Sequence, residues 1–241
     1  MKKIKNFING KITCDSDNYL DVYDPSKGEK ISEVVLSNQK DFDNVIISAQ
    51  KSQIDWANTT PLKRSRIISK YKNLIEKNLE DLAKLVSIEH GKTLEDAKGS
   101  VTRGLEVVEF ACGIPHLLKG EFSQNVGTNI DSFSIRQPLG ICAGITPFNF
   151  PAMVPMWMYP ISIACGNSFI LKPSEKDPSC SIKLAELFTE AGLPDGVFNI
   201  INGDKNVVNK LLNSDKISSI SFVGSTPVAK YIYETASKNL K

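Results

Sequence analysis

Residues 139–172 read LGICAGITPFNFPAMVPMWMYPISIACGNSFILK, and this stretch decides the fold class. From Pro138 to Leu171 the chain has no Asp, Glu, Lys, Arg or His, a length that raises the question of a membrane-spanning helix. Each internal proline would remove a backbone donor from such a helix and clash with the turn before it. These prolines are Pro138, Pro147, Pro151, Pro155 and Pro160. We therefore predict a buried strand, a loop and a buried helix.

The same rhythm continues to the end of the sequence. Apolar runs over 139–145, 168–171, 197–201 and 217–223 are followed in turn by helical patterns over 152–165, 178–191, 204–213 and from 227. Strands that alternate with helices in this way are typical of an α/β fold with a doubly wound parallel sheet.

The residues before Pro138 predict short strands and long helices, from alternating patterns and one-sided apolar stripes respectively. The expected strands are 5–12 and 19–23, which form an N-terminal arm, and a two-strand excursion within 121–137. The expected helices run from Asp41 to about Trp56, from Thr60-Pro61 to His90-Gly91, and from Thr93 to about Leu118.

The composition is that of a globular protein and excludes several classes of function. The 241 residues are 41% hydrophobic and 23% charged, which excludes disorder, collagen and coiled coil. A formal net charge of +2 is too near neutral for a nucleic-acid-binding protein. The five cysteines are scattered and only two histidines are present, so we expect no disulfide framework and no metal site. With no signal peptide recognised, we expect a cytoplasmic location and no membrane partner.

Ligands of doubly wound sheets bind beyond the carboxyl ends of the strands, so the segments after the strands form the candidate site. The third segment has Gly203 as its only glycine and lacks G-x-G-x-x-G, which disfavours an ordinary Rossmann dinucleotide site. The four segments are Thr146-Pro147-Phe148-Asn149-Phe150-Pro151, Lys172-Pro173-Ser174-Glu175-Lys176, Asn202-Gly203-Asp204 and Gly224-Ser225-Thr226-Pro227.

Three of these segments have side chains suited to binding a nucleotide or to catalysis. A helix that opens at Ser225 offers backbone donors to a phosphate, although an ordinary capped helix start would look the same. Lys172 and Glu175 are able to bracket a ribose, or form a solvated loop pair. Asn149 lies between two phenylalanines and two prolines, which makes its surroundings stiff. Its amide could point at a developing oxyanion, or Asn149 could be a loop asparagine whose hydrogen bonds are made within the protein.

Taken together, the segments resemble motifs of the aldehyde dehydrogenase superfamily, and the resemblance covers essentially the whole chain. The motifs that carry it are PFNFP at 147–151, LKPSE at 171–175 and FVGSTP at 222–227. Further motifs most resemble the coenzyme A-acylating methylmalonate-semialdehyde dehydrogenase branch, namely EHGKT at 89–93, RGLEVVEF at 103–110 and PMWM at 155–158. The implied fold is the Rossmann-like sheet of that superfamily.

The resemblance implies roles for particular residues. The implied NAD site is lined by Thr146 and Phe148, with Lys172, Glu175 and Lys176 at the adenosine ribose and Ser225 at the pyrophosphate. Asn149 would be the side-chain half of an oxyanion hole. Arg103 would recognise the carboxylate of a small semialdehyde, because a guanidinium donates two parallel hydrogen bonds. Its other interpretation is an ion pair with Glu106 or a neighbour.

In this family a cysteine thiolate attacks the aldehyde, hydride passes to NAD, and coenzyme A takes up the resulting thioester. None of Cys14, Cys112, Cys142, Cys165 and Cys180 matches that nucleophile, and Cys142 and Cys165 look like inert buried thiols. The chain therefore looks like the N-terminal half of a longer, homo-oligomeric enzyme, with the catalytic domain absent or truncated.

The resemblance also implies a division of the chain. Residues 1–120 would be the N-terminal arm and the helical part of the NAD-binding domain, 121–137 oligomerisation strands, and 138–241 an incomplete Rossmann-like core. Two alternatives remain at this point. One is a catalytically silent module that binds nucleotide or assembles with a partner. The other is a different aldehyde dehydrogenase branch, and malonate semialdehyde is as good a candidate substrate as methylmalonate semialdehyde.

Overall fold

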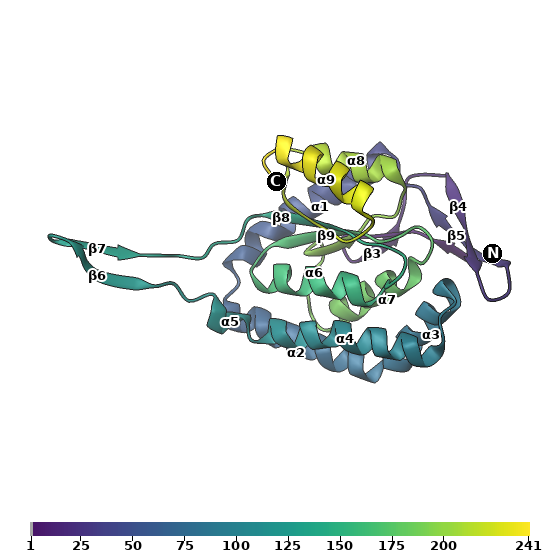
Figure 1. Ribbon diagram of the computed structural model, residues 1–241, viewed down its shortest axis with the longest axis horizontal. Coiled ribbons are helices and arrows are strands. Elements are labelled where there is room, and N and C mark those ends of the chain that lie inside the picture. The colour runs from purple at the N-terminus through teal and green to yellow at the C-terminus, as the bar shows by residue number, and fades with distance from the viewer. Residues whose placement is uncertain (1) are drawn as a thin grey trace.

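A computed structural model describes residues 2–241, and Figure 1 shows an α/β body from which a thin two-stranded arm projects. The strands are β1 (Lys2–Ile4), β2 (Asn6–Ile8), β3 (Lys11–Thr13), β4 (Tyr19–Asp24), β5 (Glu29–Val35), β6 (Phe122–Gly127), β7 (Ile130–Phe133), β8 (Ile141–Ile145), β9 (Ser168–Lys172), β10 (Phe198–Ile200) and β11 (Ile217–Phe222). The helices are α1 (Gln39–Asn58), α2 (Pro61–Lys77), α3 (Leu79–His90), α4 (Leu94–Cys112), α5 (Ile114–Leu117), α6 (Met153–Ala164), α7 (Ser179–Glu190), α8 (Lys205–Asn213) and α9 (Thr226–Lys238).

The central sheet has its strands in the order β11-β8-β9-β10-β2-β3. The four strands that follow residue 138 are parallel to their neighbours in that group, as the alternation of strands and helices predicts. Two crossovers carry the chain from β8 to β9 and on to β10, and the next returns it to β11 on the other side of β8. The sheet is therefore doubly wound, and its connections diverge between β8 and β11.

Helices cover both faces of this sheet because alternate strand residues point to opposite faces. Ile141, Ala143 and Ile145 of β8 pack in one apolar cluster with residues of α1, α8 and α9. Cys142 packs in the larger cluster, which is built with α2, α3, α4, α6 and α7. Gly144 takes the next position on that face, where an added Cβ would lie 2.7 Å from the Phe169 ring. The bare backbone of Gly144 thus makes room for a core aromatic ring.

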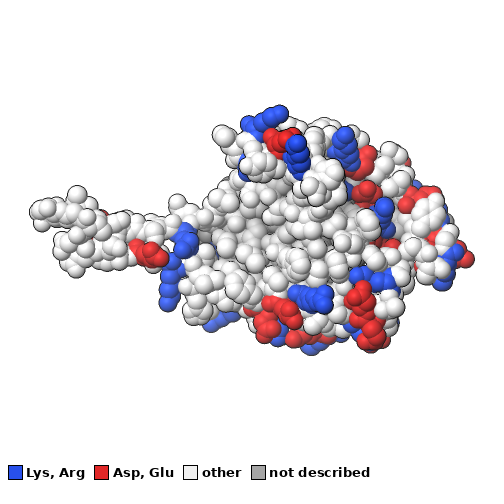
Figure 2. Space-filling view, viewed as in Figure 1, with Lys and Arg blue, Asp and Glu red and all other residues white. Residues whose placement is uncertain are grey.

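The charge-free stretch forms β8, α6 and most of β9, which confirms the interpretation as buried elements. Every residue of β8 and β9 is buried, so these strands require a continuous apolar sequence instead of an alternating one. Within residues 2–241, no helix is both long enough and apolar enough to cross a membrane. The middle of the face seen in Figure 2 is free of charged side chains, and Figure 1 places α6 there.

The N-terminal strands are present, but their partners come from far along the chain. β2 lies antiparallel to β10, with Phe7 opposite Ile200, and so extends the central sheet. β1 instead joins β5 and β4 in a separate small sheet. The buried Asn6 side chain accepts from the Asn202 N–H at 2.8 Å and donates to the Ser37 hydroxyl at 2.8 Å. The Asn6 amide thus helps to hold the N-terminal arm at the end of β10.

Two of the predicted helices are shorter than the apolar pattern suggests. The helix expected from Thr60 to His90 is divided into α2 and α3 at Asn78, whose side chain donates to the Leu74 carbonyl at 2.8 Å. The helix expected to reach Leu118 ends at Cys112, and Pro115 lies in the first turn of the short α5. The side-chain hydrogen bond of Asn78 ends one helix, and the missing N–H of Pro115 ends the other, although the apolar pattern continues past both residues.

The arm confirms the predicted two-strand excursion. β6 and β7 pair antiparallel with Phe122 opposite Phe133, and Figure 1 shows the pair extending away from the body. Phe122, Val126, Ile130 and Phe133 are each more than half exposed. The arm therefore presents apolar side chains to solvent.

Candidate functional site

The carboxyl ends of the parallel strands form one edge of the central sheet. Ile145, the last residue of β8, lies opposite Lys172 of β9 and opposite Phe222 of β11. Backbone hydrogen bonds extend this register by one residue, from Thr146 N–H to the Lys172 carbonyl at 3.2 Å and from Val223 N–H to the Ile145 carbonyl at 3.3 Å. Three of the four predicted segments therefore start side by side, at the point where the connections diverge.

Lys172 and Glu175 form an ion pair at this edge. The Lys172 Nζ and Glu175 Oε2 atoms are 2.7 Å apart, and the structure thus joins two residues that the sequence predicts to act together. The Lys172 side chain is 6% exposed and that of Glu175 is 32% exposed. The carboxylate therefore retains an open side from which it can accept hydrogen bonds from ligand hydroxyls, while the ammonium is fixed beneath it.

Two hydroxyl groups near the same edge have no partner in the described chain. The Thr146 Oγ1 atom is buried and makes no hydrogen bond. Ser225 is the N-cap residue of α9, yet its side chain does not cap the helix. An uncapped helix start leaves N–H groups and the positive end of the helix dipole available, which suits a phosphate. A helix start of this kind and free hydroxyls are chemically suited to a pyridine dinucleotide, which carries a pyrophosphate and ribose hydroxyls.

The loop between β8 and α6 presents Phe148 and Asn149 to solvent. Phe148 is 49% exposed, and the Lys176 Nζ atom lies 4.6 Å from the centre of its ring. Two predicted cofactor residues from different loops therefore contact each other. Asn149 is exposed, and its side chain makes no hydrogen bond with the described residues. Its amide is available to an external acceptor.

Arg103 stands apart from the other predicted residues. It lies exposed on α4, the helix that packs on α6, and within residues 2–241 no carboxylate comes within 4.0 Å of its guanidinium. The ion pair with Glu106, which was the alternative interpretation, is therefore absent. The next residue, Gly104, approaches Met156 of α6, where an added Cβ would lie 3.1 Å from the Met156 Cβ atom. Arg103 makes no hydrogen bond or ion pair with the strand-end residues.

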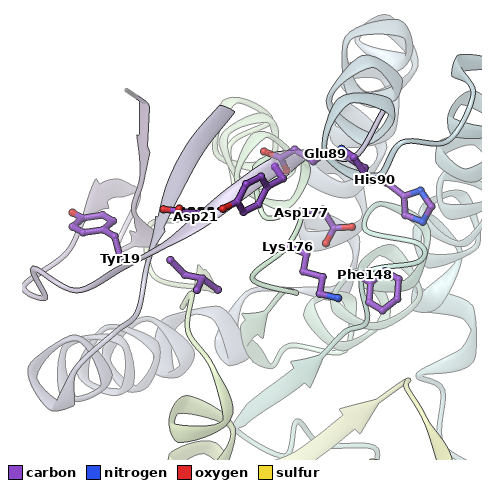
Figure 3. Close-up of a pocket in the computed structure, with 10 residues that line it drawn as sticks. Tyr19, Asp21, Glu89, His90, Phe148, Lys176 and Asp177 are labelled. Carbon is purple, nitrogen blue, oxygen red and sulfur yellow. Dashed lines mark hydrogen bonds between the residues drawn. The ribbon is translucent and has the colours of Figure 1, made fainter. Parts of the chain in front are cut away.

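The structure also shows a cavity of about 790 Å³ beside Phe148 and Lys176, between β4, the end of α3 and the start of α7. Glu89, Asp177 and His90 line it, and Figure 3 shows these side chains grouped beside Phe148 and Lys176. Glu89 accepts from the Ser179 N–H at 3.0 Å. Both carboxylate oxygens of Asp177 are buried, and neither has a hydrogen-bond partner within residues 2–241.

Burial and the nearby Glu89 charge raise the pKa of Asp177 to about 8. Burial also raises the pKa of Glu89. Sequence reasoning missed this pair as a site feature, since Asp177 before Pro178 reads as an ordinary helix start. The only available signal was the run of three charged residues, 175–177, which begins three residues after the end of a buried strand.

Burial opposes the thiolate form of four of the five cysteines. All five are free thiols, and burial raises the pKa of Cys112, Cys142, Cys165 and Cys180. Cys142 is buried as predicted, whereas Cys165 is half-buried. A raised pKa keeps a thiol protonated and poorly nucleophilic at neutral pH. Among the described residues, no group of three or more His, Cys, Asp or Glu side chains is arranged to hold a metal ion.

The chain is similar to known proteins in both sequence and structure. The chain is 53% identical over its whole length to a malonate-semialdehyde dehydrogenase of Pseudomonas aeruginosa, and covers 48% of that protein. It is 46% identical over 97% of its length to an acylating, mitochondrial methylmalonate-semialdehyde dehydrogenase of Arabidopsis thaliana, covering 39% of it. A crystal structure described as a methylmalonate-semialdehyde dehydrogenase from Sinorhizobium meliloti, complexed with NAD, superposes with a TM-score of 0.98 at 51% identity, over all of this chain and 49% of that one.

The chain thus spans about half the length of the relatives that it matches. The family model described as the aldehyde dehydrogenase family matches residues 12–241, nearly the whole sequence. A match of that extent decides the assignment. The chain belongs to the aldehyde dehydrogenase family.

Proposed function

We propose that this chain is the NAD-binding half of a coenzyme A-acylating aldehyde dehydrogenase whose substrate is malonate or methylmalonate semialdehyde. The observation that supports it most is the convergence, at the point where the sheet connections diverge, of the Lys172–Glu175 pair, the unpartnered Thr146 hydroxyl and the uncapped Ser225. Two relatives support the proposal as well. A protein named malonate-semialdehyde dehydrogenase is 53% identical to this chain, and a crystal structure described as a methylmalonate-semialdehyde dehydrogenase complexed with NAD is 51% identical to it.

In this proposal NAD is the hydride acceptor, and the protein binds and orients it. Glu175 accepts hydrogen bonds from the adenosine ribose hydroxyls, because its carboxylate is open on one side while Lys172 holds the other. Lys176 lies at the same ribose region, over the Phe148 ring. Ser225 and the start of α9 receive the pyrophosphate. Thr146 and Phe148 line the path between these positions.

Two further residues act on the substrate. Asn149 donates its amide N–H to the developing oxyanion, which its exposure and lack of an internal partner support. Arg103 binds the substrate carboxylate, which its freedom from ion pairs supports. The attacking thiolate would come from sequence beyond this chain, because burial disfavours the thiolate of four of its cysteines. Coenzyme A then accepts the acyl group as a co-substrate.

The proposed division of labour follows the fold. Residues 1–120 supply the N-terminal arm and the helices behind the NAD site, and 138–241 supply the Rossmann-like core. Residues 121–137 contain the two-stranded β6–β7 arm. The exposed Phe122 and Phe133 of this arm support contact with another copy of the chain in a homo-oligomer. The free state of all five cysteines supports a cytoplasmic location.

The first test measures NAD binding to the 241-residue chain by titration calorimetry. We expect Lys172→Met to weaken binding about tenfold or more, because it removes a charged contact and frees Glu175. Lys183→Met is the matched control, since Lys183 also pairs with a glutamate three residues later but lies on the exposed face of α7. Equal affinities for the wild type and Lys172→Met would contradict the proposed cofactor site.

The second test measures the reaction in the complete enzyme, meaning this chain extended to the length of its relatives. We expect NADH and an acyl-coenzyme A in equal amounts from malonate or methylmalonate semialdehyde, measured by absorbance and mass spectrometry. Tight NAD binding without any product would identify the catalytically silent module instead. Product from unrelated aldehydes alone would identify a different branch of the family.

A further inference from the structure

The chain turns sharply at the end of α3, and the residues of this turn face the proposed site. Gly91 is the left-handed C-cap of α3, with φ of 85°, and an added Cβ there would lie 2.7 Å from Pro25 Cγ. The Ser87 hydroxyl donates to the Lys92 carbonyl at 2.8 Å and closes the turn. The turn is therefore rigid, and it fixes His90 and Lys92 on either side of the glycine.

His90 and Lys92 each contact one of the two phenylalanines that flank Asn149. The His90 ring stacks beside that of Phe148, with centroids 6.4 Å apart and an interplanar angle of 27°. Figure 3 shows both side chains on the same side of the cavity. The Lys92 Nζ atom lies 4.4 Å from the centre of the Phe150 ring, a cation–π geometry. His90 and Lys92 of the turn thus lie against Phe148 and Phe150 of the loop, and Asn149 lies between these two phenylalanines in the sequence.

Lys92 is held firmly at this position. Its side chain is 7% exposed, and its ammonium makes an ion pair with Asp96 Oδ2 at 3.0 Å and donates to the Ser100 hydroxyl at 3.3 Å. Both partners lie on the first turns of α4. A nearly buried cation that is anchored on one side and faces a ring on the other has few alternative rotamers, so Phe150 packs against a fixed surface.

The same turn also holds the neighbouring loop. Glu89, directly before His90, accepts from the Ser179 N–H at the start of α7. The segment between β9 and α7 carries Glu175, the partner of Lys172 at the end of β9. Burial and the nearby Lys92 lower the pKa of His90, so its ring is neutral at pH 7 and packs as an aromatic group. One short turn therefore braces both loops of the proposed site.

We propose that His90 and Lys92 are positioning residues for Asn149, acting through the rings of Phe148 and Phe150. The Asn149 side chain has no hydrogen bond of its own within the described chain, so the direction of its amide follows from its backbone and from the two rings beside it. An oxyanion donor stabilises charge only when it is held in place before the reaction. The inference rests on the proposed function, in which Asn149 is that donor.

The test compares Lys92→Met, Lys92→Arg and Phe150→Leu with the control Lys98→Met. Lys98 is also a lysine in an ion pair, with Glu95 near the start of α4. In the complete enzyme we expect Lys92→Met and Phe150→Leu to lower kcat about 10- to 100-fold, because small displacements of a catalytic group are costly. The KM for NAD should stay within about twofold, since Lys92 does not touch the nucleotide residues. Lys92→Arg should restore most of kcat, because arginine keeps the cation over the ring.

A spectroscopic arm uses the 241-residue chain without substrate. We expect the side-chain amide signal of Asn149 in a ¹⁵N NMR spectrum to shift and broaden in Lys92→Met and to stay unchanged in Lys98→Met. An unshifted Asn149 amide in both Lys92→Met and Phe150→Leu would overturn the proposal. So would an unchanged kcat. If the wild-type enzyme oxidises no semialdehyde, the proposed function fails by itself, and the NMR comparison still decides whether the turn positions Asn149.

Discussion

Replacing Asp177 by Asn should stabilise the protein at neutral pH and not in acid. Asp177 is 1% exposed, and its carboxylate oxygens have no hydrogen-bond partner among the described residues. Burial beside Glu89 raises its pKa from 3.8 to about 8. The folded chain therefore keeps the proton of Asp177 at pH 7, whereas the unfolded chain loses it above about pH 4. For an acid whose pKa rises on folding, stability is highest below the unfolded pKa and falls as pH rises toward the folded pKa.

The magnitude follows from the pKa difference. Each pH unit between about 4 and 8 costs about 1.4 kcal/mol, so at pH 7, roughly three units above the unfolded pKa, the cost is about 4 kcal/mol. Asparagine does not ionise and escapes this cost. Its amide brings N–H donors that also lack partners, which offsets part of the gain. We expect Asp177→Asn to raise the free energy of unfolding by about 2–4 kcal/mol at pH 7 and by about zero at pH 4.

Urea unfolding followed by tryptophan fluorescence at pH 4, 5.5, 7 and 8.5 measures this dependence. The matched control is Asp81→Asn, because Asp81 is 71% exposed on α3 and pairs only loosely with Lys84 at 3.5 Å. The control should change stability by less than about 0.5 kcal/mol at every pH. A variant that is less stable than the wild type at pH 7, or a difference that is the same at every pH, would refute the reasoning.

Three further predictions concern the proposed site and the arm. Asn149→Ala should lower kcat of the complete enzyme about 100-fold without weakening NAD binding, and a kcat loss under threefold would remove Asn149 from the oxyanion hole. Arg103→Ala should raise KM about tenfold or more for semialdehydes that carry a carboxylate, and much less for propanal. Steady-state kinetics on both substrates decides this, since equal effects would place Arg103 outside the substrate site. Replacing both Phe122 and Phe133 by Ser should reduce the oligomer of the complete enzyme to smaller species in light scattering after gel filtration. An unchanged mass would show that the arm does not join copies.

Local sequence was sufficient to predict most elements of the sheet and where its ligand edge lies. The runs 139–145 and 168–171 are apolar because both faces of β8 and β9 are covered, and their order after residue 138 indicated a parallel sheet. The loops that follow them could be singled out for the same reason, since the carboxyl ends of parallel strands meet at one edge. The roles of Lys172, Ser225 and the other predicted residues remain predictions to be tested by binding and kinetics.

The sequence could not predict features that depend on distant partners. Nothing near Asn6 indicates that β2 lies antiparallel to β10, because that pairing is fixed by Ser37 and Asn202. The division at Asn78 escaped the pattern because the apolar stripe continues on both sides of it while a side-chain hydrogen bond ends α2. Glu89 and Asp177 are 88 positions apart, so no window of sequence shows that they share one cavity.

The sequence by itself determined the order of strands and helices, the buried character of β8 and β9 and the family, because these depend on local periodicity and on short motifs. Only the tertiary structure decided which side chains meet, namely Lys172 with Glu175, and His90 and Lys92 with the loop of Asn149. It also decided which polar groups have no partner among the described residues, such as the carboxylate of Asp177. The physical reason is that these contacts join elements far apart in the chain, and their energies depend on burial and distance, which exist only once the chain has folded.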